Sequence, residues 1–212
     1  MANNMIIDAP VDWTGENPGV YLKDDPKGPW VTLASFFRVI MSPVGSGTAL
    51  LLLASPGEVS GTEVAPNVCI TDNEVLARWL VNDFAAHFEF FRASPAIAGL
   101  NYVRLNSSSR GGDALTTYNE TVSGGGYNVR LDWHGVGKPF GVVVSPEASP
   151  TGQHTFLSMF AGADGGTVTL NGSRLPGQPA PRDAFGKQIT SAFLALSETW
   201  LRHKSVSSQP MP

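Results

Sequence analysis

The segment from Thr71 to Arg92 limits the fold most, because its apolar residues recur with the period of an α-helix. Thr71 and Glu74 form a capping box, which is typical of a helix start. We therefore predict an amphipathic helix over 71–92 that packs against a sheet. Its apolar face carries Leu76, Trp79, Leu80, Phe84, Phe88 and Phe91.

Asp83 and His87 fall in the middle of this predicted apolar face, one helical turn apart. A buried polar group without a partner costs about 1–3 kcal/mol. Two interpretations follow. The pair closes on itself as a structural hydrogen bond in the core, or it borders a site on the facing sheet.

Composition excludes several classes of partner. A chain of 212 residues suits one domain. The net charge is −4, and the 14 Lys and Arg residues are scattered, so we expect no nucleic-acid partner. No basic, apolar leader and no run of about 20 apolar residues is found, so we expect a cytoplasmic protein with no membrane partner. The single cysteine, Cys69, follows the apolar Val68 and is predicted to be a buried structural thiol.

Before the helix, residues 1–28 contain several prolines and are predicted to be an irregular N-terminal arm. Residues 30–41 and 49–55 are rich in β-branched and aliphatic residues on either side of a turn-forming run, which predicts a first hairpin. A single domain is expected over 29–203, followed by a flexible tail over 204–212.

After the helix, short strands separated by mostly Gly-rich connectors predict an antiparallel meander. The expected strands cover residues 102–106, 115–121, 127–133, 140–145, 155–160 and 167–170.

A second helix is predicted from Asp183 to His203, capped by Asp183. Its apolar stripe consists of Phe185, Ile189, Ala192, Phe193, Leu196 and Trp200.

These elements predict an α+β fold, in which two helices cover a curved, mainly antiparallel sheet of about eight strands. Their order resembles that of the helix-grip, Bet v 1-like folds, which enclose an apolar cavity between the sheet and a C-terminal helix. No motif assigns the chain to that family. A lipocalin-like barrel is the alternative, and the helix after the second strand weighs against it.

Residues 127–134 alternate between apolar and polar side chains. The polar row either forms the solvated face of the sheet or lines a wet pocket. In a pocket, Asp132 would fix the tautomer of His134, and Arg130 would hold an anionic group. The apolar row is Tyr127, Val129, Leu131 and Trp133, and the polar row is Asn128, Arg130, Asp132 and His134.

The candidate catalytic pairs are therefore His87 with Asp83 and His134 with Asp132, each with histidine as general acid or base. Arg130 is the candidate anion-binding residue. The four histidines lack metal-ligand spacing, and no phosphate-binding loop or serine-nucleophile motif is present, so we expect no metal and no cofactor. The remaining candidate ligand-binding residues are Trp79, Phe84, Phe88 and Tyr102.

Three functions remain open. The first is binding of a small, mostly apolar ligand with a polar or anionic end, in a cavity between helix and sheet. The second is a metal-independent enzyme, such as an isomerase, cyclase, lyase or hydrolase, that acts on such a ligand with a histidine. The third is an interaction or assembly subunit whose apolar helix face forms a homodimer interface.

Overall fold

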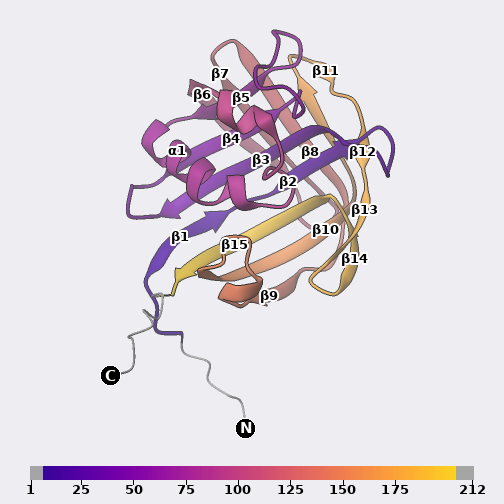
Figure 1. The fold of residues 1–212 in the computed structure, drawn as a ribbon. Helices are drawn as coiled ribbons and strands as arrows, with labels where there is room; N and C mark the ends of the chain where they lie inside the picture. The colour runs from indigo at the N-terminus through magenta and orange to yellow at the C-terminus, as the bar shows by residue number, and fades with distance from the viewer. Residues whose placement is uncertain (1–6, 204–212) are drawn as a thin grey trace.

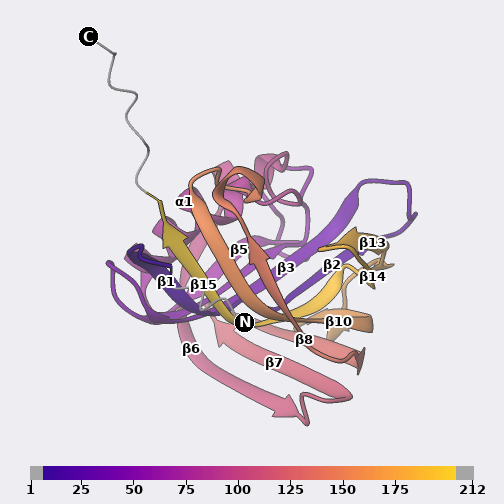
Figure 2. The ribbon, with the colours of Figure 1, turned by 90° about the horizontal axis from the view of Figure 1, so that it is seen from below.

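In the computed structural model, which describes residues 7–203, the chain forms a closed barrel of nine strands (Figures 1 and 2). Strands hold 56% of the residues and helices 11%, so the fold is mainly β. The barrel strands are β1 (Val11–Glu16), β2 (Gly19–Lys23), β3 (Trp30–Met41), β4 (Gly47–Leu53), β5 (Asn67–Thr71), β6 (Asn101–Gly112), β7 (Thr117–Gly124), β8 (Tyr127–Val136), β10 (His154–Leu170) and β15 (Ala192–Arg202), with β1 and β2 sharing one position between β3 and β15.

One helix, three 3₁₀ turns and several short strands lie outside the barrel in the described part of the chain. A helix, α1 (Glu74–Asp83), and three 3₁₀ turns, η1 (Ala85–His87), η2 (Pro95–Gly99) and η3 (Pro146–Ala148), lie in its connections. The strand β9 (Phe140–Val144) extends the sheet beside β10, and β11 (Ser173–Arg174) and β12 (Gln178–Pro179) add short edges. A separate hairpin consists of β13 (Pro181–Ala184) and β14 (Lys187–Thr190).

The ring closes where β10 pairs with β15, for instance at Phe156 opposite Trp200. Neighbouring barrel strands are antiparallel except β5 and β6, which are parallel. Parallel neighbours need a long crossover connection, and the chain between residues 72 and 100 supplies it with α1, η1 and η2.

The barrel interior is a packed core rather than an open chamber. Phe36, Leu50 and Trp133 point into it and are essentially inaccessible to solvent. The guanidinium of Arg38 donates two hydrogen bonds to the carboxylate of Glu120 across the interior. A ligand site therefore has to be sought on the outer face of the barrel.

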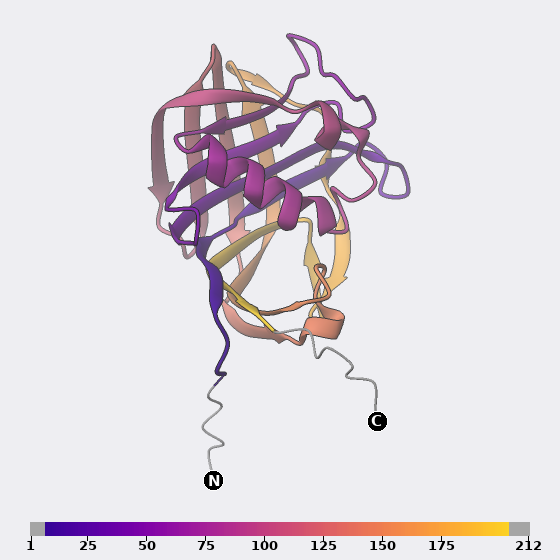
Figure 3. The ribbon, with the colours of Figure 1, turned by 60° about the vertical axis from the view of Figure 1, so that its left-hand side comes forward.

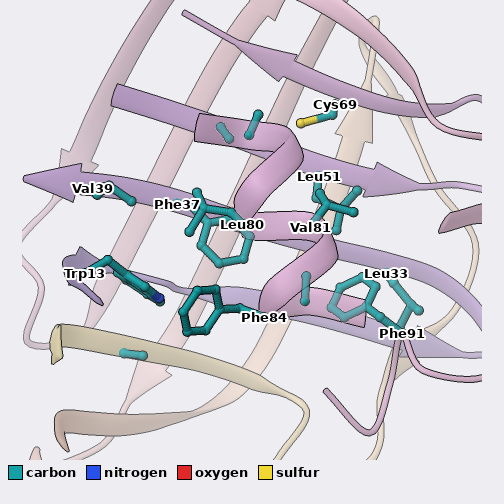
Figure 4. Close-up of a cluster of buried hydrophobic side chains, with 14 of the residues drawn as sticks. Trp13, Leu33, Phe37, Val39, Leu51, Cys69, Leu80, Val81, Phe84 and Phe91 are labelled. Atoms are coloured by element: carbon teal, nitrogen blue, oxygen red, sulfur yellow. The ribbon is translucent and has the colours of Figure 1, made fainter. Parts of the chain in front are cut away.

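A second core lies on that outer face, where α1 crosses β3, β4 and β5 (Figure 3). Leu80 of α1 and Phe84, which follows it, pack against Phe37, Leu51 and Trp13 (Figure 4). Because β3 and β4 are buried on both faces, their sequences are almost continuously apolar. Figure 2 shows β6, β7 and β8 forming the wall opposite α1.

The predicted α+β fold with two helices is wrong, and the lipocalin-like alternative is closer to the observed barrel. Residues 183–203 form the end of β13, β14 and β15 rather than a second helix. Both faces of β15 are buried, with Phe193 on the outer face and Leu194 in the barrel, so its apolar residues do not alternate and imitate a helical stripe.

The first helix is real but shorter than predicted. It begins after Asn73, whose side-chain oxygen accepts a hydrogen bond from the backbone N–H of Leu76 at 3.1 Å. Thr71, the predicted cap, belongs to β5. The α-helix ends at Asp83 and not at Arg92.

The predicted irregular arm is also wrong in part, because residues 11–23 contain β1 and β2, which complete the barrel. The first hairpin is confirmed as β3 and β4, and the meander is confirmed for β6, β7 and β8. The last two predicted strands join into the single strand β10. The predicted tail, 204–212, lies outside the described residues.

A candidate ligand pocket on the outer face

Asp83 and His87 do not lie on the buried face of the helix. Both side chains are exposed, because the α-helix stops at Asp83 and the chain turns into η1. No hydrogen bond joins them among residues 7–203. The placement on the apolar face is wrong, and an acid–base role for the pair stays a prediction.

The polar row of β8 lies on the solvated outer face of the barrel. Asn128, Arg130 and His134 are exposed, while Val129 and Trp133 are buried inside, which confirms the predicted alternation. Arg130 donates its hydrogen bonds to Asp132, at 2.6–2.9 Å, rather than facing a cavity. His134 and Asp132 therefore lie on the outer surface of the described part of the chain and line none of the pockets named below.

The aromatic residues that were predicted to line one ligand site lie at different sites in the structure. Phe84 is fully buried beneath α1, and Trp79 packs edge-on against it with ring centroids 5.1 Å apart. Tyr102 lies below the guanidinium of Arg78, 4.0 Å from it, beside a different depression. Of the predicted ligand-binding residues, Phe88 alone lines the pocket described next.

This pocket has a volume of about 210 Å³. Its lining comes from the outer face of β10 and β15, from the chain that follows α1 and from the β13–β14 hairpin. Its walls are mainly aromatic. The rings are those of Tyr21, Phe88, Phe90, Phe156, Phe160, Phe185, Phe193 and Trp200.

The aromatic rings pack on one another in a fixed arrangement. Trp200 forms the centre: it stacks on Phe88 at 5.7 Å with an interplanar angle of 20°, and lies 4.9 Å from Phe156. Phe193 stacks on Phe160 at 5.0 Å. Such contacts hold a preformed apolar site without a ligand.

The hairpin of β13 and β14 closes one side. Its turn places Phe185 5.2 Å from Phe160, although Phe185 adopts a positive φ of 53° and is still 45% exposed. Ile189 rests on Gly162 of β10, where a Cβ atom would come within 2.9 Å of its side chain. Glycine at that position therefore lets the hairpin dock.

Glu198 is the most unusual polar residue of the pocket. Only 3% of it is exposed, and its Oε1 accepts a hydrogen bond from Trp200 Nε1 at 2.7 Å. No salt bridge reaches it within residues 7–203. Burial raises the pKa of Glu198 to about 8, against the hydrogen bonds from Trp200 and Asn17, which lower it. At neutral pH this group is mainly a neutral carboxylic acid.

A bulge in β15 sets the direction of Glu198. Between the pairs Leu157–Thr199 and Met159–Leu196, β15 contains one more residue than β10. Ser197 absorbs it with a φ of 59°, in the left-handed region. The inserted residue reverses the alternation, so that Glu198 and Trp200 join Phe193 on the pocket face.

A chain of polar groups runs along the floor of the pocket. The hydroxyl of Tyr21 lies 2.8 Å from Ser35 Oγ, which donates to Asn17 Oδ1 at 3.3 Å, and the Asn17 side chain in turn bonds to Glu198. Burial raises the pKa of Tyr21 above its ordinary value, so Tyr21 stays protonated. These contacts hold the floor rigid across β2, β3 and β15.

Arg182 is the positively charged residue of the pocket lining. It projects from β13 into the pocket lining, with its guanidinium 4.5 Å from the centre of the Phe90 ring. It forms no salt bridge among the described residues, and burial lowers its pKa. Glu89, an exposed residue of the same lining, raises that pKa through its charge but forms no salt bridge with Arg182 in the described part of the chain. The half-buried guanidinium is therefore suited to an anionic group of a ligand.

Sequence reasoning missed this pocket because it assigned residues 183–203 to a helix that does not form and did not single out Glu198. Phe193 and Trp200 were recognised as apolar, but in the wrong element. No local motif marks the bulge at Ser197, so the joint position of Glu198, Trp200 and Arg182 could not be foreseen.

A larger depression of about 660 Å³ lies where β8 and β10 meet the hairpin. Lys138, Pro139, Lys187 and Gln188, which line it, are all exposed, and so it lacks the buried walls of the aromatic pocket. Within residues 7–203, no cluster of three His, Cys, Asp or Glu residues is arranged to hold a metal ion.

None of the helices in the described part of the chain has the length and apolar character needed to cross a membrane. Comparisons of this chain with protein-family models, with characterised proteins and with solved structures give no match.

Proposed function

We propose that the aromatic pocket binds a small, mostly apolar ligand that carries one anionic or strongly polar end. The observation that carries this proposal is the meeting of preformed aromatic walls with two unusual polar groups, Glu198 and Arg182, in one cavity. In an otherwise apolar pocket, a small number of polar groups orients the ligand and determines which ligands bind.

The volume sets the size of the ligand. A cavity of ~150 Å³ holds benzene, and the present pocket measures about 210 Å³. One aromatic ring with a short side chain, or two fused rings, therefore fits. The stacked rings of Phe88 and Trp200 suit a flat ligand.

Charge sets the expected end group. Arg182 is the cation that lines the pocket, whereas Glu198 is mainly neutral at pH 7 because burial raises its pKa to about 8. An anionic end at Arg182 gains a charge-assisted hydrogen bond and faces the neutral acid of Glu198 at the floor. The other carboxylate of the lining, Glu89, is exposed, so solvent screens its charge.

The test compares two probes of equal shape, 3-phenylpropionate and 3-phenylpropan-1-ol, by isothermal titration calorimetry with the full chain. We expect the carboxylate to bind about tenfold tighter, which corresponds to one charge-assisted contact. In Arg182→Gln this preference should vanish, and in Arg174→Gln, a matched change at an exposed arginine of β11, it should persist.

A second variant tests the location. Ala148 is exposed at the pocket lining, so Ala148→Trp fills the pocket without disturbing the core. Loss of binding of both probes in this variant supports the aromatic pocket. If neither probe binds the unaltered protein, or if both bind Ala148→Trp unchanged, the proposed function is wrong.

A further inference from the structure

A buried glutamate is a costly way to build a pocket floor. The residue receives hydrogen bonds from Trp200 and Asn17, and no cation is among the groups that shift its pKa. Glutamine has the same shape and an amide oxygen that accepts the same bonds, without the cost of burying an ionisable group. What glutamate adds is a proton that can be released and regained.

The backbone is also distorted at this place. Ser197 takes a left-handed conformation, and the extra residue of the bulge is what brings Glu198 to the pocket. Bulges are frequent next to active sites, where they redirect a side chain, and strained backbone gathers at functional sites. Both features point to the carboxyl group as the reactive element of the pocket.

We propose that Glu198 exchanges a proton with the ligand in the aromatic pocket, and that the site thereby catalyses a proton shift in a small unsaturated or aromatic carbonyl compound. This inference rests on the proposed binding function. It replaces the histidine pairs expected from the sequence, which lie outside the pocket, with a single carboxyl group that lines it.

The reaction needs no metal, oxidant or second substrate. The Glu198 carboxylate takes a proton from the carbon next to the carbonyl group, and the C–H electron pair forms a carbon–carbon double bond as the carbonyl becomes an enolate. The carboxylic acid then returns the proton to another carbon of the conjugated system. The charge of Arg182, which lines the same pocket, favours the enolate.

The pH dependence follows from the groups that face Glu198. Tyr21 of β2, Arg182 of β13 and Glu89 after η1 line the same cavity. On the other side, His154 of β10 contacts Trp200. Burial raises the pKa of Glu198 to about 8, so the basic form accumulates as the pH rises through 8. A base with a pKa near the working pH is effective in proton transfer.

The test uses 5-nitro-1,2-benzisoxazole, a flat bicyclic probe that reports on a carboxylate base in an apolar pocket. The base removes the C–H proton, the N–O bond breaks, and a coloured cyanophenolate forms. With the full chain we expect a rate that rises through pH 8 and levels off above it. Glu198→Gln should lower the rate about 100-fold, and Glu63→Gln, at an exposed site, should leave it unchanged.

Binding of the same probe, measured by calorimetry, separates the two proposals. Unchanged binding together with a lost rate in Glu198→Gln supports proton transfer by Glu198. If the unaltered protein binds the probe but shows no step in rate near pH 8, the inference is wrong while the binding function stands. If it does not bind either this probe or 3-phenylpropionate, the binding function itself is wrong. The pH profile of the unaltered protein needs no variant to fold.

Discussion

The indole nitrogen of Trp200 donates a 2.7 Å hydrogen bond to the carboxyl group of Glu198, two residues earlier in the same strand. Both side chains lie on the pocket face of β15, because they stand on the far side of the bulge at Ser197. The same indole stacks on Phe88. One side chain thus fixes the position of the acid and forms part of the aromatic wall.

The burial of Glu198 makes the stability of the protein depend on pH. The pKa of Glu198 is raised from 4.5 to about 8 in the folded protein, so between these values the unfolded chain releases a proton that the folded chain keeps. Stability should therefore fall as the pH rises from about 4.5 to about 8 and stay low above it.

Glu198→Gln removes this contribution. The difference in free energy of unfolding between the variant and the unaltered protein should grow over that pH window by a few kcal/mol, at most about 5. Urea denaturation at several pH values measures it, with Glu63→Gln as the control. Parallel curves for Glu198→Gln and the unaltered protein would mean that Glu198 is not buried as an acid.

Trp200→Phe keeps an aromatic ring but removes the N–H donor. Because the hydrogen bond from Trp200 lowers the pKa of Glu198, its loss should raise that pKa further. The pH midpoint of probe turnover should move upward, and stability should fall by about 1–3 kcal/mol. Phe88→Leu removes a stacking partner without touching the hydrogen bond, so its pH midpoint should not move. An unchanged midpoint in Trp200→Phe would contradict this role for the indole.

An element could be predicted from the sequence where local residue patterns determine its structure, and could not where contacts between distant residues determine it. The hairpin of β3 and β4 and the alternation around Trp133 were predictable, since turn residues and period-two burial are local signals. The start of α1 was predictable to within a few residues. Its end was not, because the turn at Phe84 reflects the packing of that ring against Trp13 and Trp200.

The residues of the aromatic pocket could not be predicted from local sequence patterns for a different reason. Closure of the barrel buries both faces of β15, which removes the alternation that marks a strand, and the bulge at Ser197 shifts what remains. Arg182 and Glu198 line the same pocket only because the hairpin folds back over β10. No residue spacing in the sequence indicates that these two side chains line one pocket.

The bulge gives a test of its own at Ser197. Its φ of 59° suits glycine and strains a β-branched residue. Ser197→Gly should change the free energy of unfolding by less than about 1 kcal/mol, toward greater stability, and keep probe binding. Ser197→Val should cost about 2 kcal/mol and weaken binding. Ser173→Val, at an exposed position in β11, is the matched control. Equal effects of valine at both sites would argue against the strained bulge.

A buried carboxylate connects β1 to the seam between β10 and β15. Asp12, 5% exposed, accepts a 2.7 Å hydrogen bond from Arg202 Nε, and the same oxygen lies 2.7 Å from His154 Nε2. Asp12→Ala leaves the buried ring of His154 without its partner, whereas the exposed Arg202 can bind water instead, so the change should cost about 1–3 kcal/mol. Asp83→Ala removes an exposed carboxylate and should change stability by less than about 0.5 kcal/mol. Thermal and urea denaturation compare the two, and a large loss in Asp83→Ala would restore the buried position that the sequence first indicated.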